Sequence, residues 1–295
     1  MRQSFSIVKA TALEILSEPL SLLTLLAALA IAVLAPAFHY HQFGDPTRMA
    51  RDAGFSALFT CGSVLAVFGT VRAFRREIES GTLEMALVHP VSRPAFFLAK
   101  TFGAFCAYLV FVLTVLGAAI VMFEGAAIGG ALAKQTGDIA RIFGPCLAGG
   151  VAIAVFPLGL AALLNRFARF RFVLSSLMSA LALSVCGGGF LVFLSRGYVL
   201  RLVPVAALLV LLSGMLLTAA AAFAVRFKAN VAVTATGLVF ALLVPAIGNY
   251  YLADALSGAG TVSWRYVGLA LAAAVPVDLL FLLLGIRFIG ERDVS

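Results

Sequence analysis

The side chains that could do chemistry are concentrated in residues 73–94, AFRREIESGTLEMALVHPVSRP, the most polar passage of an otherwise apolar chain. Its carboxylates, Glu77, Glu79 and Glu84, can pair with basic residues on another protein. Such ion pairs across an interface set orientation and register more than affinity. The passage therefore predicts recognition of a partner. The alternative is a solvated loop whose charges only keep it in the cytoplasm.

A second chemical candidate is Asp278, which lies near the middle of a predicted membrane-spanning segment with no basic residue within a helical turn. A carboxylate at mid-membrane costs about 2.5–3.5 kcal/mol on insertion scales. It should therefore be protonated, face a wet cavity or pair with another helix. We expect Asp278 to line a transport path or an interface between two copies of the chain. A protonated acid that is hydrogen-bonded inside the helix bundle is the alternative.

Enzymatic and metal chemistry is not expected from this chain. His39 and His41 stand near Asp45, but two alternating histidines with one acid are weak evidence for a metal site, and a polar loop explains them. The histidines lie away from any nucleophile motif, and the stretch GGALAKQTG lacks the Gly-Lys-Thr ending of a phosphate loop. The sequence predicts no catalytic residue, no metal site and no cofactor bound by this chain.

The composition is that of an integral membrane protein. Of the 295 residues, 63% are hydrophobic and 12% are charged, whereas soluble domains are roughly 45–50% apolar and 25% charged. The formal net charge of +8 does not indicate nucleic-acid binding, because basic ends of membrane helices account for the excess. The lipid bilayer is therefore the expected surrounding of most of the chain.

Apolar runs of about 20 residues predict eight membrane-spanning helices and an all-α integral membrane fold. They cover residues 19–38, 53–72, 95–123, 144–164, 172–195, 202–225, 231–252 and 267–288. The fifth and sixth could instead form a re-entrant pair within residues 187–225, because Gly187, Gly188 and Gly189 could break the helix. That alternative leaves six full spans.

Lysine and arginine are distributed unequally when these segments alternate through the bilayer from a cytoplasmic N-terminus. Fourteen of the 21 basic residues then lie on the cytoplasmic side and seven lie outside. Because basic residues concentrate on the cytoplasmic side of membrane proteins, both termini and residues 73–94 are predicted to face the cytoplasm.

Residues 1–18 are predicted to form an amphipathic helix that lies in the membrane interface and bends into the first span at Pro19. Its apolar residues recur at helical spacing: Phe5, Val8, Ala12, Ile15 and Leu16. A frayed polar tail is the alternative. No internal repeat or low-complexity linker divides the chain, so residues 1–295 are predicted to form one membrane domain.

A short helix between two breaks is expected within residues 73–94. The helix of the second span should end at Ser80 and Gly81, because glycine readily adopts the left-handed conformation that terminates helices. Ser92 and Pro94 restart the chain as the third span. The residues expected to build the short helix are Thr82 as its cap, Leu83 and Leu87 on its apolar face, Glu84 in its first turn and Pro90 as its stop.

This passage resembles the signature of type 2 ABC transporter permeases. That signature shows two glutamates, then Gly-Thr-Leu-Glu, an apolar run, Pro-Val-Ser-Arg and a lysine at the base of the next span. The matching residues are Glu77, Glu79, Gly81, Thr82, Leu83, Glu84, Pro90, Val91, Ser92, Arg93 and Lys100. The subgroup most similar to this chain includes permeases associated with multicopper-enzyme maturation and general export permeases. His89 before the proline and a span count above six depart from the pattern.

The resemblance implies a permease subunit that couples ATP hydrolysis by a separate cytosolic subunit to export across a prokaryotic cytoplasmic membrane. The short helix would dock in a groove of that ATPase. The implied coupling residues are Glu77, Glu79, Gly81, Thr82, Leu83, Glu84, Leu87, Pro90 and Arg93. The implied partners are two cytosolic ABC ATPases, which carry ATP and Mg, and a second permease copy in a homodimer or related heterodimer.

Two other classes of function remain open at this stage. One is an ion- or proton-coupled carrier that uses Asp278, although such carriers commonly show paired repeats and several intramembrane charges. The other is a membrane scaffold without transport activity, which would leave the coupling signature unexplained. The identity of the transported substrate does not follow from the sequence.

Overall fold

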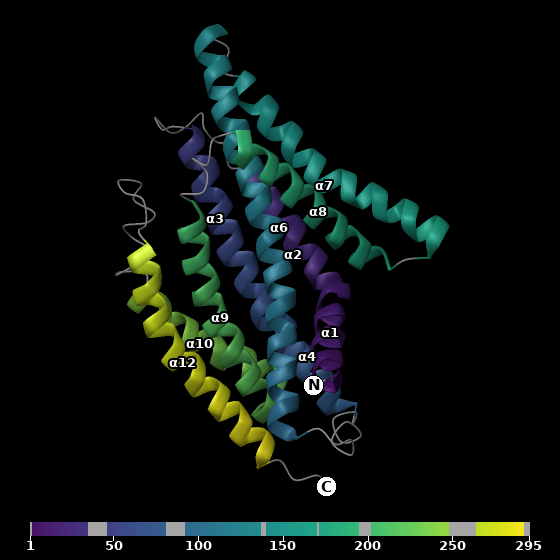
Figure 1. The fold of residues 1–295 in the computed structure, drawn as a ribbon, viewed down its shortest axis with the longest axis vertical. Helices are drawn as coiled ribbons and strands as arrows, with labels where there is room; N and C mark the ends of the chain where they lie inside the picture. Colours follow the sequence, from purple (N-terminus) through teal and green to yellow (C-terminus); the bar gives the residue numbers. More distant parts are fainter. Residues whose placement is uncertain are drawn as a thin grey trace. The chain divides into compact units, whose positions relative to one another are not determined.

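The computed structural model describes residues 2–34, 46–80, 92–136, 140–169, 171–194, 202–247 and 264–291. This described part is helical and contains no strand (Figure 1). The helices are α1 (Arg2–Ser17), α2 (Pro19–Leu34), α3 (Pro46–Val64), the π-helical turn η2 (Leu65–Gly69), α4 (Thr70–Glu79), α6 (Arg93–Thr136), α7 (Ala140–Ala168), α8 (Phe172–Leu194), α9 (Val203–Arg226), α10 (Ala229–Ile247) and α12 (Trp264–Gly290). The predicted all-α class is confirmed.

Six of the described helical stretches are long and apolar enough to cross a membrane. They are Ala50–Glu79, Arg93–Gly129, Ala148–Phe167, Phe172–Leu194, Val203–Arg226 and Trp264–Gly290. A seventh results if Ser4–Ser17 and Pro19–Leu34, which meet at a bend, form one broken span. The predicted first and seventh spans correspond to α2 and α10, which are shorter. The chain is therefore a multi-pass membrane protein, and eight separate crossings stay a prediction.

The three consecutive glycines do not break α8, which runs unbroken from Phe172 to Leu194. Gly188 instead lies against the backbone of α6: a Cβ on Gly188 would lie 3.2 Å from the carbonyl oxygen of Gly117. Small residues let two membrane helices approach closely. Both α8 and α9 are long enough to span, which favours two full spans over the re-entrant pair.

Helix α6 is longer than the predicted third span. It has 44 residues, which corresponds to about 66 Å at a rise of 1.5 Å per residue, against a hydrocarbon core of about 30 Å. The predicted span stopped at residue 123 because Glu124 interrupts the apolar run, whereas the apolar helical stretch continues to Gly129. Glu124, which the prediction left outside the span, therefore lies within the helix.

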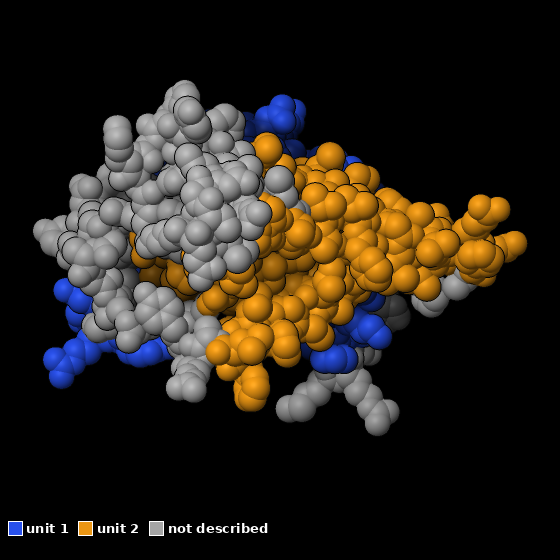
Figure 2. All heavy atoms as spheres, turned by 90° about the horizontal axis from the view of Figure 1, so that it is seen from above, with its two compact units in different colours: residues 1–16, 63–109, 207–295 blue, residues 17–62, 110–206 orange. Residues whose placement is uncertain are grey.

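The described helices group into two compact units (Figure 2). Unit 1 comprises Met1–Leu16, Ser63–Leu109 and Ala207–Ser295, and unit 2 comprises Ser17–Gly62 and Val110–Ala206. Helix α6 belongs to both units, since its backbone continues through Leu109 without interruption. One domain over residues 1–295 stays a prediction, with these units as its parts.

The core of unit 1 forms where α4, α6, α9, α10 and α12 pack together. Its buried residues are Val71, Phe74, Phe96, Phe97, Ala220, Ala221, Ala224, Val225, Ala232 and Ile289. Helix α12 can approach Phe97 only because position 285 is glycine: a Cβ there would overlap the Phe97 ring. This core lies directly beside the two helix ends that flank residues 81–91.

Helix α1 packs against α6 within unit 1. A Cβ on Gly103 of α6 would lie 2.7 Å from the carbonyl oxygen of Val8 and 2.9 Å from the Cβ of Thr11. Thr11, Ile15 and Leu16 are buried, whereas 70% of Phe5 is exposed. The predicted helix and its break before Pro19 are confirmed. Phe5 does not share the buried stripe, and a position in the membrane interface stays a prediction.

Unit 2 contains α2, α7, α8 and most of α6. Arg169, which directly follows α7, has a left-handed backbone (φ 54°). Gly150 of α7 lies so close to α2 that a Cβ there would overlap the side chain of Val33. Large apolar side chains such as Phe156 and Phe193 are exposed, as expected for helices that face lipid.

Candidate coupling site and membrane carboxylate

The structure describes both helix ends that flank the predicted coupling helix. Helix α4 ends at Glu79, and the amide of Ser80 donates to the carbonyl oxygen of Arg76 at 3.0 Å. After residues 81–91, the amide of Phe96 donates to the carbonyl oxygen of Ser92 at 3.0 Å, in the first turn of α6. The predicted helix end at Ser80 and restart at Ser92 are both confirmed.

The middle of the predicted coupling segment lies outside the described residues. This applies to Gly81, Thr82, Leu83, Glu84, Leu87 and Pro90. Of the predicted coupling residues, Glu77, Glu79 and Arg93 lie within the described part of the chain. The two-turn helix between the breaks stays a prediction. The described part of the site consists of the two helix ends that flank it.

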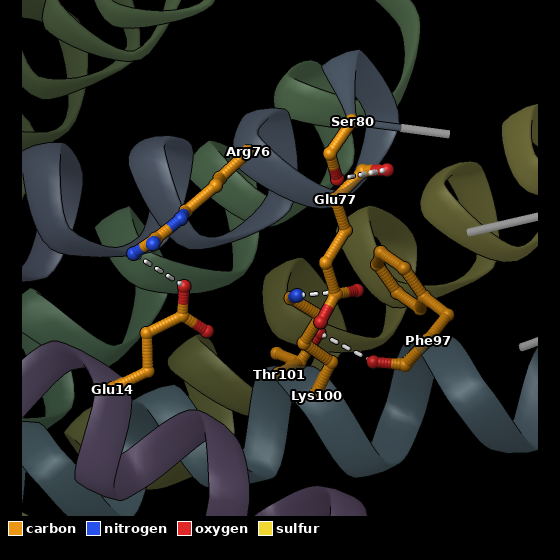
Figure 3. A network of polar contacts seen from close by, with 7 residues as sticks. All are labelled: Glu14, Arg76, Glu77, Ser80, Phe97, Lys100 and Thr101. Atoms are coloured by element: carbon orange, nitrogen blue, oxygen red, sulfur yellow. Dashed lines mark hydrogen bonds and ion pairs between the residues drawn. The ribbon is translucent and has the colours of Figure 1, made fainter. Parts of the chain in front are cut away.

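A buried ion pair joins these flanks. The Nζ of Lys100 in α6 lies 2.6 Å from Oε2 of Glu77 in α4 (Figure 3). The Lys100 side chain is 0% exposed and that of Glu77 is 30% exposed. Burying an ammonium without a counter-charge is costly, so the Glu77 carboxylate is what allows Lys100 to lie inside. The pair therefore holds the end of α4 to the start of α6.

Aromatic rings complete the surroundings of Lys100. Its Nζ lies 5.4 Å from the centroid of the Phe74 ring and 5.9 Å from that of the Phe96 ring. A cation within about 6 Å of an aromatic ring is attracted by the negative face of that ring. Phe74 also packs against Phe97, with ring centroids 5.6 Å apart. The Lys100 ammonium is therefore enclosed by the apolar core of unit 1, whereas Glu77 stays partly exposed.

Glu77 differs from its expected role. We expected it to be exposed and to pair with basic residues of a partner, but its carboxylate is bound to Lys100. The reason is tertiary: the buried ammonium needs an anion, and Glu77 is one turn below Phe74, which lines the same core. Glu79 lies on the surface, where its Oε1 accepts from Arg75 at 2.8 Å and 62% of its side chain is exposed.

Two further contacts attach other helices to the same flanks. The Nη1 of Arg76 lies 3.5 Å from Oε1 of Glu14 in α1 (Figure 3). The Nη1 of Arg93 donates to the carbonyl oxygen of Gly290, the last residue of α12, at 3.1 Å. Helices α1, α4, α6 and α12 thus converge on the ends of residues 81–91. A displacement of that segment would act on all four helices.

Lys100 is the residue of this site to which sequence reasoning assigned no role. It matched the last position of the signature, but its burial and its partner depend on tertiary packing. The available signal was local: Lys100 stands in the apolar run AFFLAKTFGAF. A lysine at such a position, within helical reach of no carboxylate on its own helix, must find an anion on a neighbouring one.

Asp278 lies in α12 and contacts α9. Its Oδ1 lies 2.7 Å from Oγ1 of Thr218. The Thr218 hydroxyl also lies 3.0 Å from the carbonyl oxygen of Met215. The sequence predicted that Asp278 would be protonated, face a cavity or pair with another helix, and the structure shows the pairing. A role in transport stays a prediction.

Asp278 also lines a cavity of about 740 Å³ within unit 1. Residues of α1, α6, α9 and α12 form its wall: Ser4, Phe5, Val8, Ala95, Leu98, Ala99, Thr101, Phe102, Phe105, Gly214, Leu217, Thr218, Asp278 and Leu282. Asp278 is the charged side chain among these described residues. The arrangement can accommodate an apolar molecule and present one carboxyl group to it.

The described residues contain no group of three or more histidine, cysteine, aspartate or glutamate side chains that could hold a metal ion. His39, His41 and Asp45 lie outside the described part of the chain. Asp278 and Thr218 together offer one carboxyl and one hydroxyl group, which is too few for a metal site with closed coordination.

A family model described as ABC-2 family transporter protein matches residues 15–187, more than half of the chain. The chain therefore belongs to the ABC-2 transporter family, whose members are membrane transport components rather than enzymes and normally work with an ATPase partner. Comparisons with curated proteins and with solved structures gave no match. Glu77 and Lys100 lie inside the matched region, whereas Asp278 lies outside it.

Proposed function

We propose that this chain is the permease subunit of an ATP-driven exporter in a prokaryotic cytoplasmic membrane. In this proposal two copies, or one copy and a related chain, assemble with two cytosolic ABC ATPases that bind ATP and Mg. Residues 81–91 face the cytoplasm and dock on the ATPase, both termini are cytoplasmic, and α1 lies in the membrane interface. The proposal also places the chain in the subgroup that includes permeases of multicopper-enzyme maturation.

The observation that carries the proposal is the ion pair between Glu77 and Lys100. A docking segment transmits force only if its two ends are fixed to the helices that must move. Here the pair fixes α4 to α6 across residues 81–91, at a separation of 2.6 Å between charged atoms. A force on the docking segment would then move α4 and α6 together as a rigid unit and would not be absorbed by local bending.

The first test is co-purification of the full chain with an ATPase from its native host in a mild detergent. We expect an ABC ATPase to accompany the chain and its hydrolysis rate to rise in the complex. Gly81→Pro should lower the stimulated rate severalfold while membrane insertion stays normal. Glu79→Lys should lower it as well, because a surface carboxylate would be replaced by a cation. Failure of any ATPase to co-purify contradicts the proposal.

A crosslinking experiment tests the docking segment directly. In a variant without native cysteines, Leu83→Cys modified with a photoreactive maleimide should crosslink to the ATPase. Phe193→Cys is the matched control: it is 82% exposed and lies in α8, at the end predicted to face outward. Crosslinking from both positions, or from Phe193→Cys alone, would contradict the proposed docking.

Labelling with a membrane-impermeant thiol reagent tests the orientation. Ser80→Cys should react in inverted vesicles and stay unreactive in intact cells.

The competing carrier function makes a different prediction, because the reconstituted chain without ATPase would then drive transport from an ion gradient alone. Gradient-driven transport that is abolished in Asp278→Asn would replace the ATP-driven proposal.

A further inference from the structure

We propose that the cavity of unit 1 that Asp278 lines binds a hydrophobic organic cation, with the Asp278 carboxylate as its counter-charge. The inference deepens the proposed function, on which it rests for the role of the cation as transported substrate. Asp278 and Thr218 lie outside the region matched by the family model, whereas the α6 wall of the cavity lies inside it.

The cavity has the size of a binding site for a small organic molecule. Its volume of about 740 Å³ falls within the range of about 300–1,000 Å³ that is typical of ligand pockets. Its wall follows α6 from Ala95 to Phe105, a rise of about 15 Å along that helix. The cavity is therefore long enough to hold a molecule with two or three rings.

The wall selects an apolar molecule. Most of its side chains are aliphatic or aromatic, and the threonine hydroxyl at its α6 side already has a partner, since Oγ1 of Thr101 donates to the carbonyl oxygen of Phe97 at 2.9 Å. A small hydrated ion would exchange its water shell for few oxygen ligands, those of Ser4, Thr218 and Asp278. A hydrophobic molecule gains by leaving water, because burial of apolar surface is favourable in proportion to its area.

The single carboxyl group selects positive charge. Among the described residues that line the cavity, no basic side chain accompanies Asp278. An anionic ligand would be repelled, and an attraction between opposite charges is stronger in apolar surroundings than in water. The lining thus fits one positive charge on an apolar body better than it fits a phospholipid, whose phosphate carries negative charge.

The contacts of Thr218 allow Asp278 to be either neutral or charged without rearrangement. The Thr218 hydroxyl has one proton but two neighbouring oxygens, Asp278 Oδ1 at 2.7 Å and the carbonyl oxygen of Met215 at 3.0 Å. In the empty cavity a protonated Asp278 can donate to Thr218, which then donates to Met215. With a cation bound, Asp278 releases its proton to water, Thr218 donates to the ionised Oδ1, and the carboxylate supplies the counter-charge.

Binding can be measured on the full chain in nanodiscs of neutral phosphatidylcholine, which do not concentrate cations by surface charge. The probe is radiolabelled tetraphenylphosphonium, and empty nanodiscs correct for partition into lipid. Tetraphenylborate is the matched competitor, since it has the same shape and the opposite charge. We expect saturable binding of the cation that tetraphenylborate does not displace.

Variants assign this binding to the cavity. Asp278→Asn, which keeps the shape of the side chain, should weaken binding about tenfold or more, whereas Asp278→Glu should retain it. Glu124→Gln is the matched control, because it neutralises another carboxylate within a spanning helix, in unit 2. Gly214→Leu leaves Asp278 charged and should also weaken binding, because a side chain there projects into the cavity. It keeps the proposal testable if Asp278→Asn fails to fold.

Three results would overturn the inference: no saturable binding, equal affinity in Asp278→Asn and the native chain, or displacement by tetraphenylborate. The last would mean an apolar cavity without charge selection, as for a lipid chain. Binding is measured without the ATPase, so failure of coupling does not affect it. Absence of cation binding in a chain that still stimulates its ATPase would overturn this inference alone.

Discussion

Lys100 and Asp278 are two ionisable side chains that unit 1 places in apolar surroundings, and they differ in their partners. Lys100 is fully buried and lies 2.6 Å from the carboxylate of Glu77. Asp278 is partly exposed to a cavity, and its partner Thr218 is a hydroxyl group without charge. A matched charge fixes two helices to each other. A carboxylate without a positively charged partner, such as Asp278, can instead bind a positively charged ligand.

The location of the two sites fits this difference. The Glu77 and Lys100 pair lies at the helix ends that flank residues 81–91, where the proposed coupling requires helices to move together. Asp278 is 12 residues before Gly290, the end of α12, which places it about 18 Å along the helix from that end. The ion pair thus lies at the end of unit 1 that is predicted to face the cytoplasm, and the accessible carboxyl group lies deeper in the predicted membrane.

The largest loss of stability should come from removing the Glu77 carboxylate, which pairs with Lys100. Glu77→Leu leaves a fully buried ammonium without a counter-charge, and we expect it to lower the free energy of unfolding by about 3 kcal/mol. Lys100→Met should cost less, because the remaining Glu77 can turn to water. The double variant should be more stable than Glu77→Leu alone. Thermal unfolding of the purified chain in detergent measures this order, and equal losses in all three would contradict the assignment.

A smaller loss of stability, together with a loss of cation binding, is expected when α1 is displaced from α6. Gly103→Ala places a Cβ 2.7 Å from the carbonyl oxygen of Val8, so α1 must shift, at a cost of about 1–3 kcal/mol. Because α1 supplies Ser4, Phe5 and Val8 to the cavity wall, cation binding should fall.

The matched control for this substitution is Gly159→Ala, where a Cβ meets nothing within 4 Å. It should preserve both stability and cation binding. Unfolding temperature and tetraphenylphosphonium affinity, measured side by side, check the pair. Equal behaviour of Gly103→Ala and Gly159→Ala would show that α1 does not pack against α6 as described.

The smallest effect should come from the exposed pair of Arg75 and Glu79. Its atoms lie 2.8 Å apart, but 62% of the Glu79 side chain is exposed, and exposed pairs four residues apart in helices contribute about 0.3–0.5 kcal/mol. Glu79→Gln should therefore leave the unfolding temperature nearly unchanged while ATPase stimulation falls. A loss of stability as large as that of Glu77→Leu would mean that the two glutamates share one structural role.

Much of the fold was predictable because lipid imposes strong constraints on sequence. The breaks at Ser80 and Ser92 followed from glycine, serine and proline chemistry, and the helical segments followed from runs of apolar residues. The same reasoning predicted the span of α8 but left a break at its three glycines open, whereas Gly188 packs closely against Gly117. It also ended the third span before Glu124, because one carboxylate interrupts the apolar run without ending the helix.

The sequence by itself determined that the chain is an all-α membrane protein with one polar passage at residues 73–94 and one carboxylate, Asp278, in its last long apolar segment. These features are local, since they depend on the chemistry of neighbouring residues along the chain. Only the tertiary structure decided that Glu77 binds Lys100 and that Asp278 lines a cavity beside Thr218. Those partners lie 23 and 60 residues apart in the chain, and packing of the helices, which no local pattern specifies, brings them together.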